Sequence, residues 1–317
     1  MKKDMRFVIV STRQKYGGAI VLHALCTYLR ELGMKASIYY IGESDYREGR
    51  KVKFWIKQII FQLCDIYKQI IVKILGEDKL LENKKYSGYT NVTIKKCKKK
   101  YIPFVGKNTI VVYPDVVYGN FLHAKNVVRW LLYYNRYDEK AYGKNDIFFA
   151  YRDIFNDDKF NPQNRILNIA WFDLNVYKQT NFGKRSGICY VVRKGASRTD
   201  LPKKFDGVII DSLSEKRKVE ILNRCEYCIS YDTQTSYSTI AAICGCKSVV
   251  IPEYGKSYSD YRDNDEERYG VAFGMSDEQL AWADSTQKKA RELYVKLNEN
   301  GKAETKKFVE ICKNYFI

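Results

Sequence analysis

Four polar side chains with hydroxyl or carboxylate groups follow a strand-like run in the second half of the chain. They are Asp232, Thr233, Thr235 and Ser236. The apolar run 227–231 before them predicts a buried parallel strand, and a helix is expected to begin at about Thr235 and to end at Gly245. Such a helix start presents unpaired N–H groups at the carboxyl end of a strand, where phosphate binds well. The stretch therefore predicts a phosphate site, although the same residues also serve as ordinary helix caps.

A glycine turn near the start of the chain has a similar arrangement. Arg6–Ser11 predicts a first buried strand, and an amphipathic helix that ends at Gly33 follows Gly17 and Gly18. Paired glycines allow a ligand to approach a helix start closely, because they carry no side chain. The next strand is expected at 35–41. A strand, a helix and a strand in this order predict a doubly wound α/β domain.

The rest of the chain continues this alternation and predicts a second domain of the same class. Further strands are expected at 108–113, 165–174, 187–192, 207–210 and 248–251, and helices at 214–223, 277–300 and 302–315. We therefore expect two Rossmann-like, doubly wound lobes. The predicted domains are residues 1–178 and 179–300, followed by a terminal helix at 301–317.

The net charge of +18 is concentrated in the first half of the chain. Residues 1–145 hold 28 lysines and arginines against 12 aspartates and glutamates, whereas residues 146–317 hold 27 against 25. Residues 50–107 alone hold 15 against 4. Such a region favours an anionic partner. The alternatives are nucleic acid, an acidic membrane surface and a phosphorylated lipid.

The start of this basic region predicts a helix at 50–75 with a narrow polar stripe on an otherwise apolar and aromatic surface. No apolar run in it reaches the length that spans a bilayer. Two interpretations remain open: a core helix with a thin wet edge, or a helix that lies on a membrane. The side chains that would contact lipid are Phe54, Trp55, Ile59, Ile60 and Phe61. The lysine cluster at 95–100 is either a solvated loop or a contact with lipid headgroups.

The nine cysteines are scattered and odd in number, which favours a reducing compartment over a disulfide framework. No signal-peptide pattern is expected near the N-terminus, so we expect a cytoplasmic protein. Two closely spaced cysteine pairs could in principle bind zinc. They are Cys225 with Cys228, and Cys244 with Cys246. Cys228 falls inside an expected buried strand, which favours core thiols over zinc ligands.

Several stretches resemble bacterial glycosyltransferases of the two-lobed GT-B kind that make capsules and O-antigens. They are Tyr113-Pro114-Asp115, Gly119-Asn120, the stretch 124–132, the strand and basic turn at 190–195, and the helix with Asp232 and Ala241-Ala242. The resemblance implies a cleft between the lobes and a last helix that crosses back to the first lobe. The chain lacks the glutamate-rich donor signature of the family's retaining members.

The resemblance also implies transfer of a sugar from a nucleotide-sugar donor to a glycan or lipid-linked acceptor in surface polysaccharide synthesis. The protein would then be peripheral on the inner face of the cell membrane. Cations and helix starts stabilise the charge that develops on the leaving diphosphate. We assign this role to Arg193, Lys194 and Gly195 with the stretch 232–236, and we count Gly17 and Gly18 among the phosphate-binding residues.

If the enzyme inverts the sugar, a base must take the proton of the acceptor hydroxyl, and Asp115 and His23 are the candidates. No acidic pair has a metal-ligand context, so no obligatory metal or other cofactor is expected. Two alternatives remain: a nucleotide-sugar epimerase of the same architecture, which needs paired acid and base carboxylates, and a basic nucleic-acid-binding protein. We expect no nucleic acid partner, because that alternative leaves the two doubly wound halves unexplained.

Overall fold

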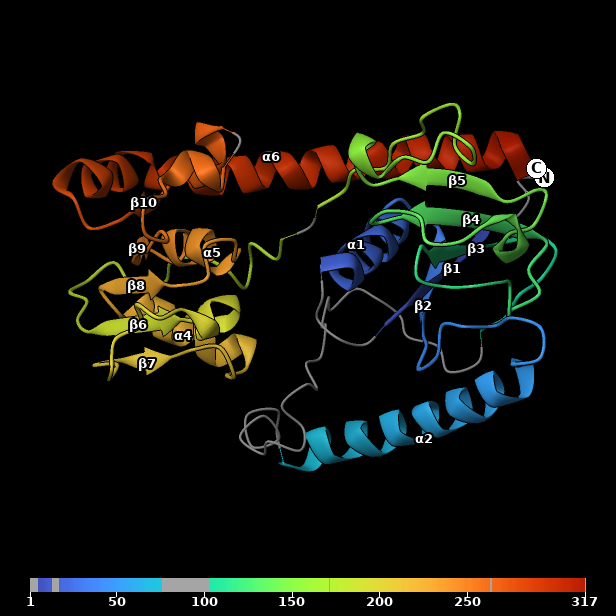
Figure 1. Ribbon diagram of the computed structural model, residues 1–317, viewed down its shortest axis with the longest axis horizontal. Helices are drawn as coiled ribbons and strands as arrows, with labels where there is room; N and C mark the ends of the chain where they lie inside the picture. Colours follow the sequence, from blue (N-terminus) through green and yellow to red (C-terminus); the bar gives the residue numbers. More distant parts are fainter. Residues whose placement is uncertain (1–4, 13–16, 76–102, 171, 263, 317) are drawn as a thin grey trace. The chain divides into compact units, whose positions relative to one another are not determined.

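The computed structural model describes residues 5–12, 17–75, 103–170, 172–262 and 264–316, which divide into two units of mixed α/β structure (Figure 1). Of the described residues, the first unit takes in 5–12, 17–75, 103–170 and 297–316, and the second takes in 172–262 and 264–296. The long helix α6 (Asp277–Phe316) thus contributes its first half to the second unit and its second half to the first.

The first unit is built on a five-stranded parallel sheet. Its strands are β1 (Arg6–Ser11), β2 (Lys35–Tyr40), β3 (Thr109–Pro114), β4 (Asn126–Leu131) and β5 (Ile147–Ala150), and its helices are α1 (Gly17–Glu31), α2 (Lys51–Leu75) and the end of α6. The strand order is β2-β1-β3-β4-β5, so the direction of winding reverses between β1 and β3. In sheets of this order, ligands bind at the carboxyl ends of the two strands where the winding reverses.

Both faces of this sheet are buried. On one face, Phe308 of α6 packs between Phe7 and Phe149, with ring centroids 5.8 Å and 5.0 Å away. On the other face, Phe54 of α2 and Phe121 are buried with their ring centroids 4.9 Å apart. Strands that are covered on both sides need apolar residues at successive positions, which explains the continuous apolar runs in the sequence.

The second unit repeats this sheet topology. Its strands are β6 (Ile188–Val191), β7 (Val208–Ile209), β8 (Tyr227–Ser230), β9 (Lys247–Val250) and β10 (Val271–Phe273), and its helices are α4 (Glu215–Arg224), α5 (Tyr237–Ile243) and the start of α6. The order β10-β9-β8-β6-β7 is again all parallel, and the winding reverses between β6 and β8. The predicted α/β class with two doubly wound sheets is confirmed.

Two predictions of secondary structure are wrong. The described residues of 165–174 form no strand, and only an isolated bridge joins Ala150 to Ile166. The two predicted terminal helices are one helix, because Gly301 does not interrupt α6. A Cβ at Gly301 would lie 2.8 Å from the carbonyl oxygen of Ala170, so this glycine serves close packing of the helix and not its termination.

The helix α2 directs the side-chain amides of Gln58 and Gln62 toward the protein, whereas Lys53 and Lys57 of the expected polar stripe are exposed. Gln58 is 1% exposed, and its Nε2 donates to the carbonyl of Tyr40 at 2.8 Å while its Oε1 accepts from the N–H of Gly42 at 2.9 Å. Nε2 of Gln62 donates to the same Tyr40 carbonyl at 2.8 Å. These amides bond to backbone groups at and just beyond the end of β2. The interpretation as a core helix with a wet edge is therefore wrong, because most apolar side chains of the helix are exposed. Of the side chains expected to contact lipid, Phe54 and Phe61 instead pack against the core of the first unit.

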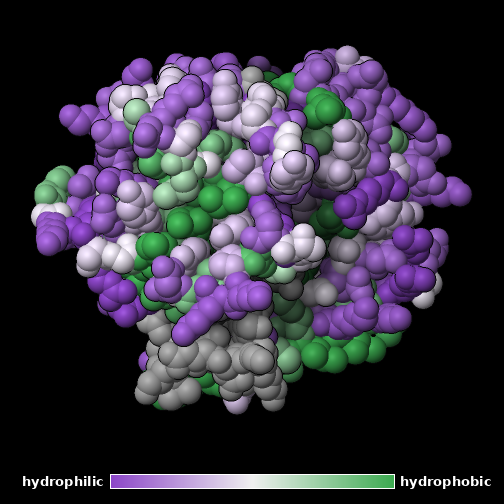
Figure 2. All heavy atoms as spheres, turned by 60° about the vertical axis from the view of Figure 1, so that its left-hand side comes forward, coloured by the Kyte–Doolittle hydropathy of each residue, from purple (hydrophilic) through white to green (hydrophobic). Residues whose placement is uncertain are grey.

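The opposite side of α2 is apolar and exposed along the helix, and we call it the α2 face. Its side chains are Val52, Trp55, Ile56, Ile59, Ile60, Leu63, Ile66, Tyr67, Ile70 and Ile74. They recur every three or four residues, which places them on one side of a helix. Ile59 and Leu63, near its middle, are 58% and 61% exposed. Hydrophobic side chains gather at the lower edge of the molecule in Figure 2, where α2 lies in Figure 1.

A buried arginine on β4 joins the loops of the first unit. Arg129 is 2% exposed, and its Nε donates to the carboxylate of Asp146 at 2.7 Å. Its Nη1 donates to the carbonyls of Val117 at 3.3 Å and Gly119 at 3.0 Å. The guanidinium also lies 4.8 Å from the ring centre of Tyr113. A buried charge with this many partners fixes the loop that follows β3.

We expect Arg129→Met to destabilise the first unit by about 3–5 kcal/mol, because it leaves the buried carboxylate of Asp146 unpaired. Urea denaturation followed by circular dichroism measures the loss. Lys125→Met is the matched control, because Lys125 is an exposed cation beside the same strand. Equal stability of the two variants would show that the buried pair contributes nothing.

Candidate active site

Two turns meet at the carboxyl edge of the second sheet, where its winding reverses. One follows β6 and contains the short helix η4 (Arg193–Ser197), and the other joins β8 to α5. Gly195 in the first turn packs so closely against the second that a Cβ would lie 2.3 Å from the carbonyl oxygen of Tyr231. Only glycine fits in this space. The structure therefore brings together the two stretches that the sequence assigns to phosphate binding.

The backbone of Arg193 is in the left-handed region, with φ of +33°. The carboxylate of Asp211 holds this turn, since its Oδ2 accepts from the N–H groups of Val192 at 3.0 Å and Arg193 at 2.8 Å. Backbone strain of this kind gathers at functional sites and persists where the surroundings fix it. The guanidinium of Arg193 is exposed and lies 5.7 Å from the ring centre of Tyr237, and Lys194 is also exposed. Both cations are accessible to an anionic ligand.

The four polar residues after β8 have different roles. Asp232 and Thr235 are buried, and Oδ1 of the first and Oγ1 of the second each accept a backbone N–H two residues further on, at 3.2 Å. Ser236 is exposed and makes no capping bond, and Thr233 is half-buried. The helix α5 begins two residues later than predicted and has seven residues. Asp232 and Thr235 therefore shape the turn, whereas Ser236 and Thr233 are accessible.

A buried ionic network that the sequence does not predict lies under this edge. The hydroxyl of Tyr237 donates to Glu215 at 2.5 Å and accepts from Nζ of Lys218 at 3.1 Å, and that ammonium also donates to Glu215 at 3.1 Å. Burial, and then the nearby Glu215 carboxylate, raise the pKa of Tyr237 far above its ordinary range. The network fixes the ring next to Arg193. Its members are scattered in the sequence, so no spacing predicts it.

Arg262, in the loop after β9, is a further cation that the sequence does not predict. Its guanidinium lies 5.4 Å from the ring centre of Phe273, the last residue of β10. Burial lowers the pKa of Arg262, and the negative charges of Glu267 and Asp232 oppose this shift. The charge of Arg262 therefore interacts with that of Asp232 in the turn after β8. The acidic loop that carries it has the composition of a solvated surface, so the sequence gives no signal for it.

The equivalent edge of the first sheet carries Gly17, Gly18 and Asp115. Gly17 is the first residue of α1, and a Cβ at Gly18 would lie 3.3 Å from the side chain of Leu132. Asp115 follows β3, is 6% exposed, and accepts the N–H of Leu132 with its Oδ1 at 3.2 Å. Burial raises the pKa of Asp115, and the Leu132 N–H and the charge of Arg136 only partly oppose it. A carboxyl group with a raised pKa at such an edge has the properties of a general base.

His23 lies inside the first core. It is 0% exposed, its Nδ1 is 2.6 Å from the carbonyl oxygen of Ala19, and its Nε2 is 2.6 Å from the hydroxyl of Tyr40. The ring therefore joins α1 to the end of β2 and has no access to an external substrate in this structure. Of the two candidate bases, we retain Asp115.

Within the described ranges, no group of three or more histidine, cysteine, aspartate or glutamate side chains is placed to hold a metal ion. The thiols of Cys225, Cys228, Cys244 and Cys246 are buried in the core of the second unit. The core-thiol interpretation of these cysteines is confirmed. The expectation that activity needs no metal stays a prediction.

No family model matches the chain, and no curated protein matches it. Among solved structures, the spinosyn forosaminyltransferase SpnP aligns over 98% of this chain and 100% of its own, with 11% identity and a TM-score of 0.41. A glycosyltransferase from Rickettsia africae ESF-5 covers 99% of each chain at 9% identity and a TM-score of 0.42. The T4 phage β-glucosyltransferase covers 98% of this chain and 99% of its own at 10% identity and a TM-score of 0.38.

Proposed function

We propose that this protein is a glycosyltransferase that moves a sugar from a nucleotide-sugar donor to a glycan acceptor, which is lipid-linked, in bacterial surface polysaccharide synthesis. The second unit binds the donor, and the first unit carries the acceptor and the base Asp115. Three kinds of observation support the proposal: the paired doubly wound sheets, the polar and charged groups at the edge where each reverses its winding, and the sequence resemblance.

The observation that carries the proposal is the joined pair of turns at the edge of the second sheet. Arg193, Lys194 and Arg262 supply positive charge there, and Ser236 supplies an accessible hydroxyl. A nucleoside diphosphate is the leaving group of sugar transfer, and charge develops on it as the bond between the anomeric carbon and the phosphate oxygen breaks. Cations that are already fixed near the diphosphate lower this barrier. Gly195 lets the two turns pack closely against each other, so these cations and the Ser236 hydroxyl can contact the same ligand.

Donor binding tests this assignment. We expect Arg193→Ala and Lys194→Ala each to weaken the binding of a nucleoside diphosphate about tenfold to hundredfold, because each removes a charge-assisted contact of about 1.5–3 kcal/mol. We expect a smaller loss, of a few-fold, for Ser236→Ala. Calorimetry with UDP, GDP, TDP and CDP identifies the nucleotide and gives the affinities.

Lys216→Ala is the control for this series, because Lys216 is an exposed lysine of α4 that lies outside the two turns. Its affinity should equal that of the wild type. Wild-type affinity in all three site variants would remove the donor assignment.

We predict that transfer continues in EDTA. The expectation rests on Arg193 and Lys194, which supply the positive charge that a divalent cation supplies in metal-dependent transferases. The measurement is the rate of nucleoside diphosphate release before and after chelation. Loss of activity on chelation, restored by magnesium or manganese, would contradict the prediction.

The α2 face supports the membrane part of the proposal. Apolar side chains cover the exposed side of the helix, and the exposed lysines Lys51, Lys53 and Lys57 lie beside them. A helix of this kind lies in the headgroup region of a bilayer, with its apolar side toward the acyl chains and its lysines near anionic lipid. No helix in the described part of the chain is long and apolar enough to cross a membrane. The basic cluster at 95–100 falls outside the described residues.

Nucleic acid fits the α2 face less well than lipid does. The face is mainly isoleucine, leucine and valine, whereas single-stranded nucleic acid is bound by aromatic side chains that stack on bases. Aliphatic side chains have no donors or acceptors that could form hydrogen bonds with phosphate and ribose groups. The positive charge of this region is therefore better matched by an anionic membrane.

A further inference from the structure

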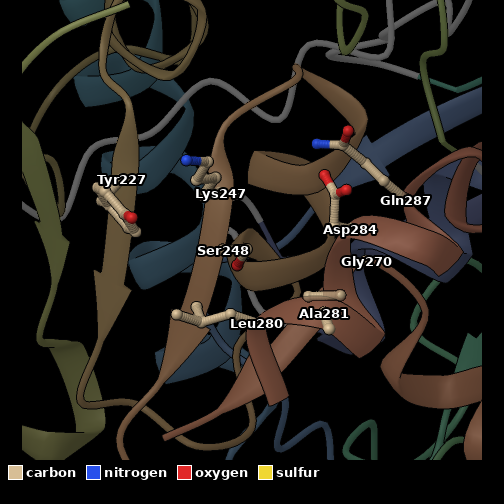
Figure 3. Close-up of a pocket in the computed structure, with 9 residues that line it drawn as sticks. Tyr227, Lys247, Ser248, Gly270, Leu280, Ala281, Asp284 and Gln287 are labelled. Atoms are coloured by element: carbon tan, nitrogen blue, oxygen red, sulfur yellow. The ribbon is translucent and has the colours of Figure 1, made fainter. Parts of the chain in front are cut away.

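The second unit contains a cavity of about 330 Å³ on the edge of its sheet opposite the donor turns. Tyr227 and Lys247 begin β8 and β9, and Gly270 precedes β10, so these residues lie at the amino ends of parallel strands. The other wall is the first half of α6. Figure 3 shows Lys247 and Ser248 on β9 opposite Leu280, Asp284 and Gln287 of α6. The cavity therefore does not belong to the donor site.

One polar group in this cavity is buried without a partner. Ser248 is 2% exposed, and its Oγ makes no hydrogen bond with any described residue. Buried hydroxyl groups are nearly always bonded, and an exception calls for an explanation. A ligand hydroxyl in the cavity would supply the missing partner once rotation of the Ser248 side chain turned its Oγ toward the cavity.

The remaining lining combines polar groups with apolar walls. Asp284 provides an exposed carboxylate that bonds to none of the described residues, and Nε2 of Gln287 makes only a long contact with the Cys246 carbonyl, at 3.5 Å. The ring of Tyr227 and the side chain of Leu280 provide the apolar surface. Carboxylate and amide groups bond neighbouring hydroxyls, and ring and aliphatic surfaces pack on C–H groups. This mixture matches a sugar ring.

Other ligand classes match the lining less well. A phosphorylated ligand would meet the Asp284 carboxylate, and the cation at the site, Lys247, is already paired with Glu226 at 3.1 Å. A wholly apolar ligand would leave the buried Ser248 hydroxyl without a partner. The volume is at the small end of ligand pockets. We propose that this cavity binds one or two units of a neutral saccharide, at a site separate from the donor edge.

A saccharide site here would hold a glycan on the transferase while the donor edge turns over. That role rests on the proposed function, whereas binding itself does not. The experiment uses the full chain and a panel of probes, namely the methyl glycosides of glucose, galactose, mannose, rhamnose and N-acetylglucosamine and their common disaccharides. Ligand-observed NMR titration measures saturable binding at millimolar concentrations.

We expect at least one probe to bind, and we expect Asp284→Ala and Ser248→Ala each to weaken it at least tenfold. Ala281→Trp, which fills the cavity from its exposed rim, should abolish binding. Ser285→Ala is the matched control, because Ser285 is an exposed residue of α6 next to Asp284 and outside the lining. Ser248→Ala should not lower the melting temperature, since the hydroxyl has no partner to lose.

Arg193→Ala separates this site from the donor site. It should leave saccharide binding unchanged, and the cavity variants should leave nucleoside diphosphate binding unchanged. Failure of every probe to bind, or binding that Asp284→Ala and Ala281→Trp do not affect, would overturn the proposal. Saccharide binding that is lost in Arg193→Ala would also overturn it, because the sugar would then occupy the donor edge.

Discussion

Asp115→Asn is expected to lower the rate of sugar transfer by about 10²–10⁴-fold, the usual contribution of a positioned general base. The amide keeps the shape of the side chain and its bond to the N–H of Leu132 but cannot take a proton. Burial raises the pKa of Asp115, so the ionised form is disfavoured in the folded protein. The variant should therefore be at least as stable as the wild type at neutral pH.

The pH profile gives an independent check on this role. Activity requires the ionised carboxylate, so kcat/KM should fall on the acid side with a pKa above the ordinary carboxyl range, and this limb should be absent from the variant's residual activity. Nucleoside diphosphate affinity should not change. Asp138→Asn, at an exposed aspartate of the same unit, is the control. Wild-type activity of Asp115→Asn would remove the residue from the mechanism.

The α2 face is expected to carry most of the attachment to membranes. To test this, glutamine replaces four exposed residues of the face in one variant, namely Ile59, Leu63, Ile66 and Ile70. If each side chain loses about 1 kcal/mol of partial burial, the total of about 4 kcal/mol corresponds to roughly a 10³-fold weaker association. Co-sedimentation with vesicles of anionic and neutral phospholipid, at low and high salt, measures it.

The control exchanges isoleucine and leucine at the same four positions, which keeps the apolar area and should keep binding. Salt should weaken binding to anionic vesicles in both the wild type and this control, because exposed charges are screened within about 10 Å at 0.1 M. Undiminished binding by the glutamine variant would contradict the membrane assignment. A wild-type dimer that the glutamine variant converts to a monomer, without vesicle binding by either, would show that the face pairs with a second copy.

Much of the sheet structure could be predicted because parallel strands that are covered on both faces leave continuous apolar runs. Strands β1, β2, β3, β6, β7, β8 and β9 all lie at predicted strands. Strands β4, β5 and β10 have no predicted counterpart. β4 contains the charged Arg129, whose burial depends on Asp146 of a later loop, and β10 has only three residues. Such pairing is set by tertiary contacts that one sequence does not reveal.

The site was less predictable than the fold. The basic turn at Arg193 and the glycine that holds it follow a recognisable strand, whereas Arg262 lies in a loop with the composition of any surface. The direction of α2 was also undetermined, because a helix with one polar stripe fits a core or an interface equally well. Gln58 and Gln62 decide it, since their amides bond to backbone groups around the end of β2. His23 has the right chemistry for a base, and only the structure shows that it is buried.

The most direct test of the proposed function is the release of nucleoside diphosphate from a panel of UDP-, GDP-, TDP- and CDP-linked sugars, with and without a bacterial lipid extract as acceptor. We predict release from at least one donor that increases when the extract is added, falls at least a hundredfold in Asp115→Asn, and is reduced in Arg193→Ala. A chain that releases no nucleoside diphosphate from any donor, or one whose release is the same in both variants as in the wild type, would contradict the proposal.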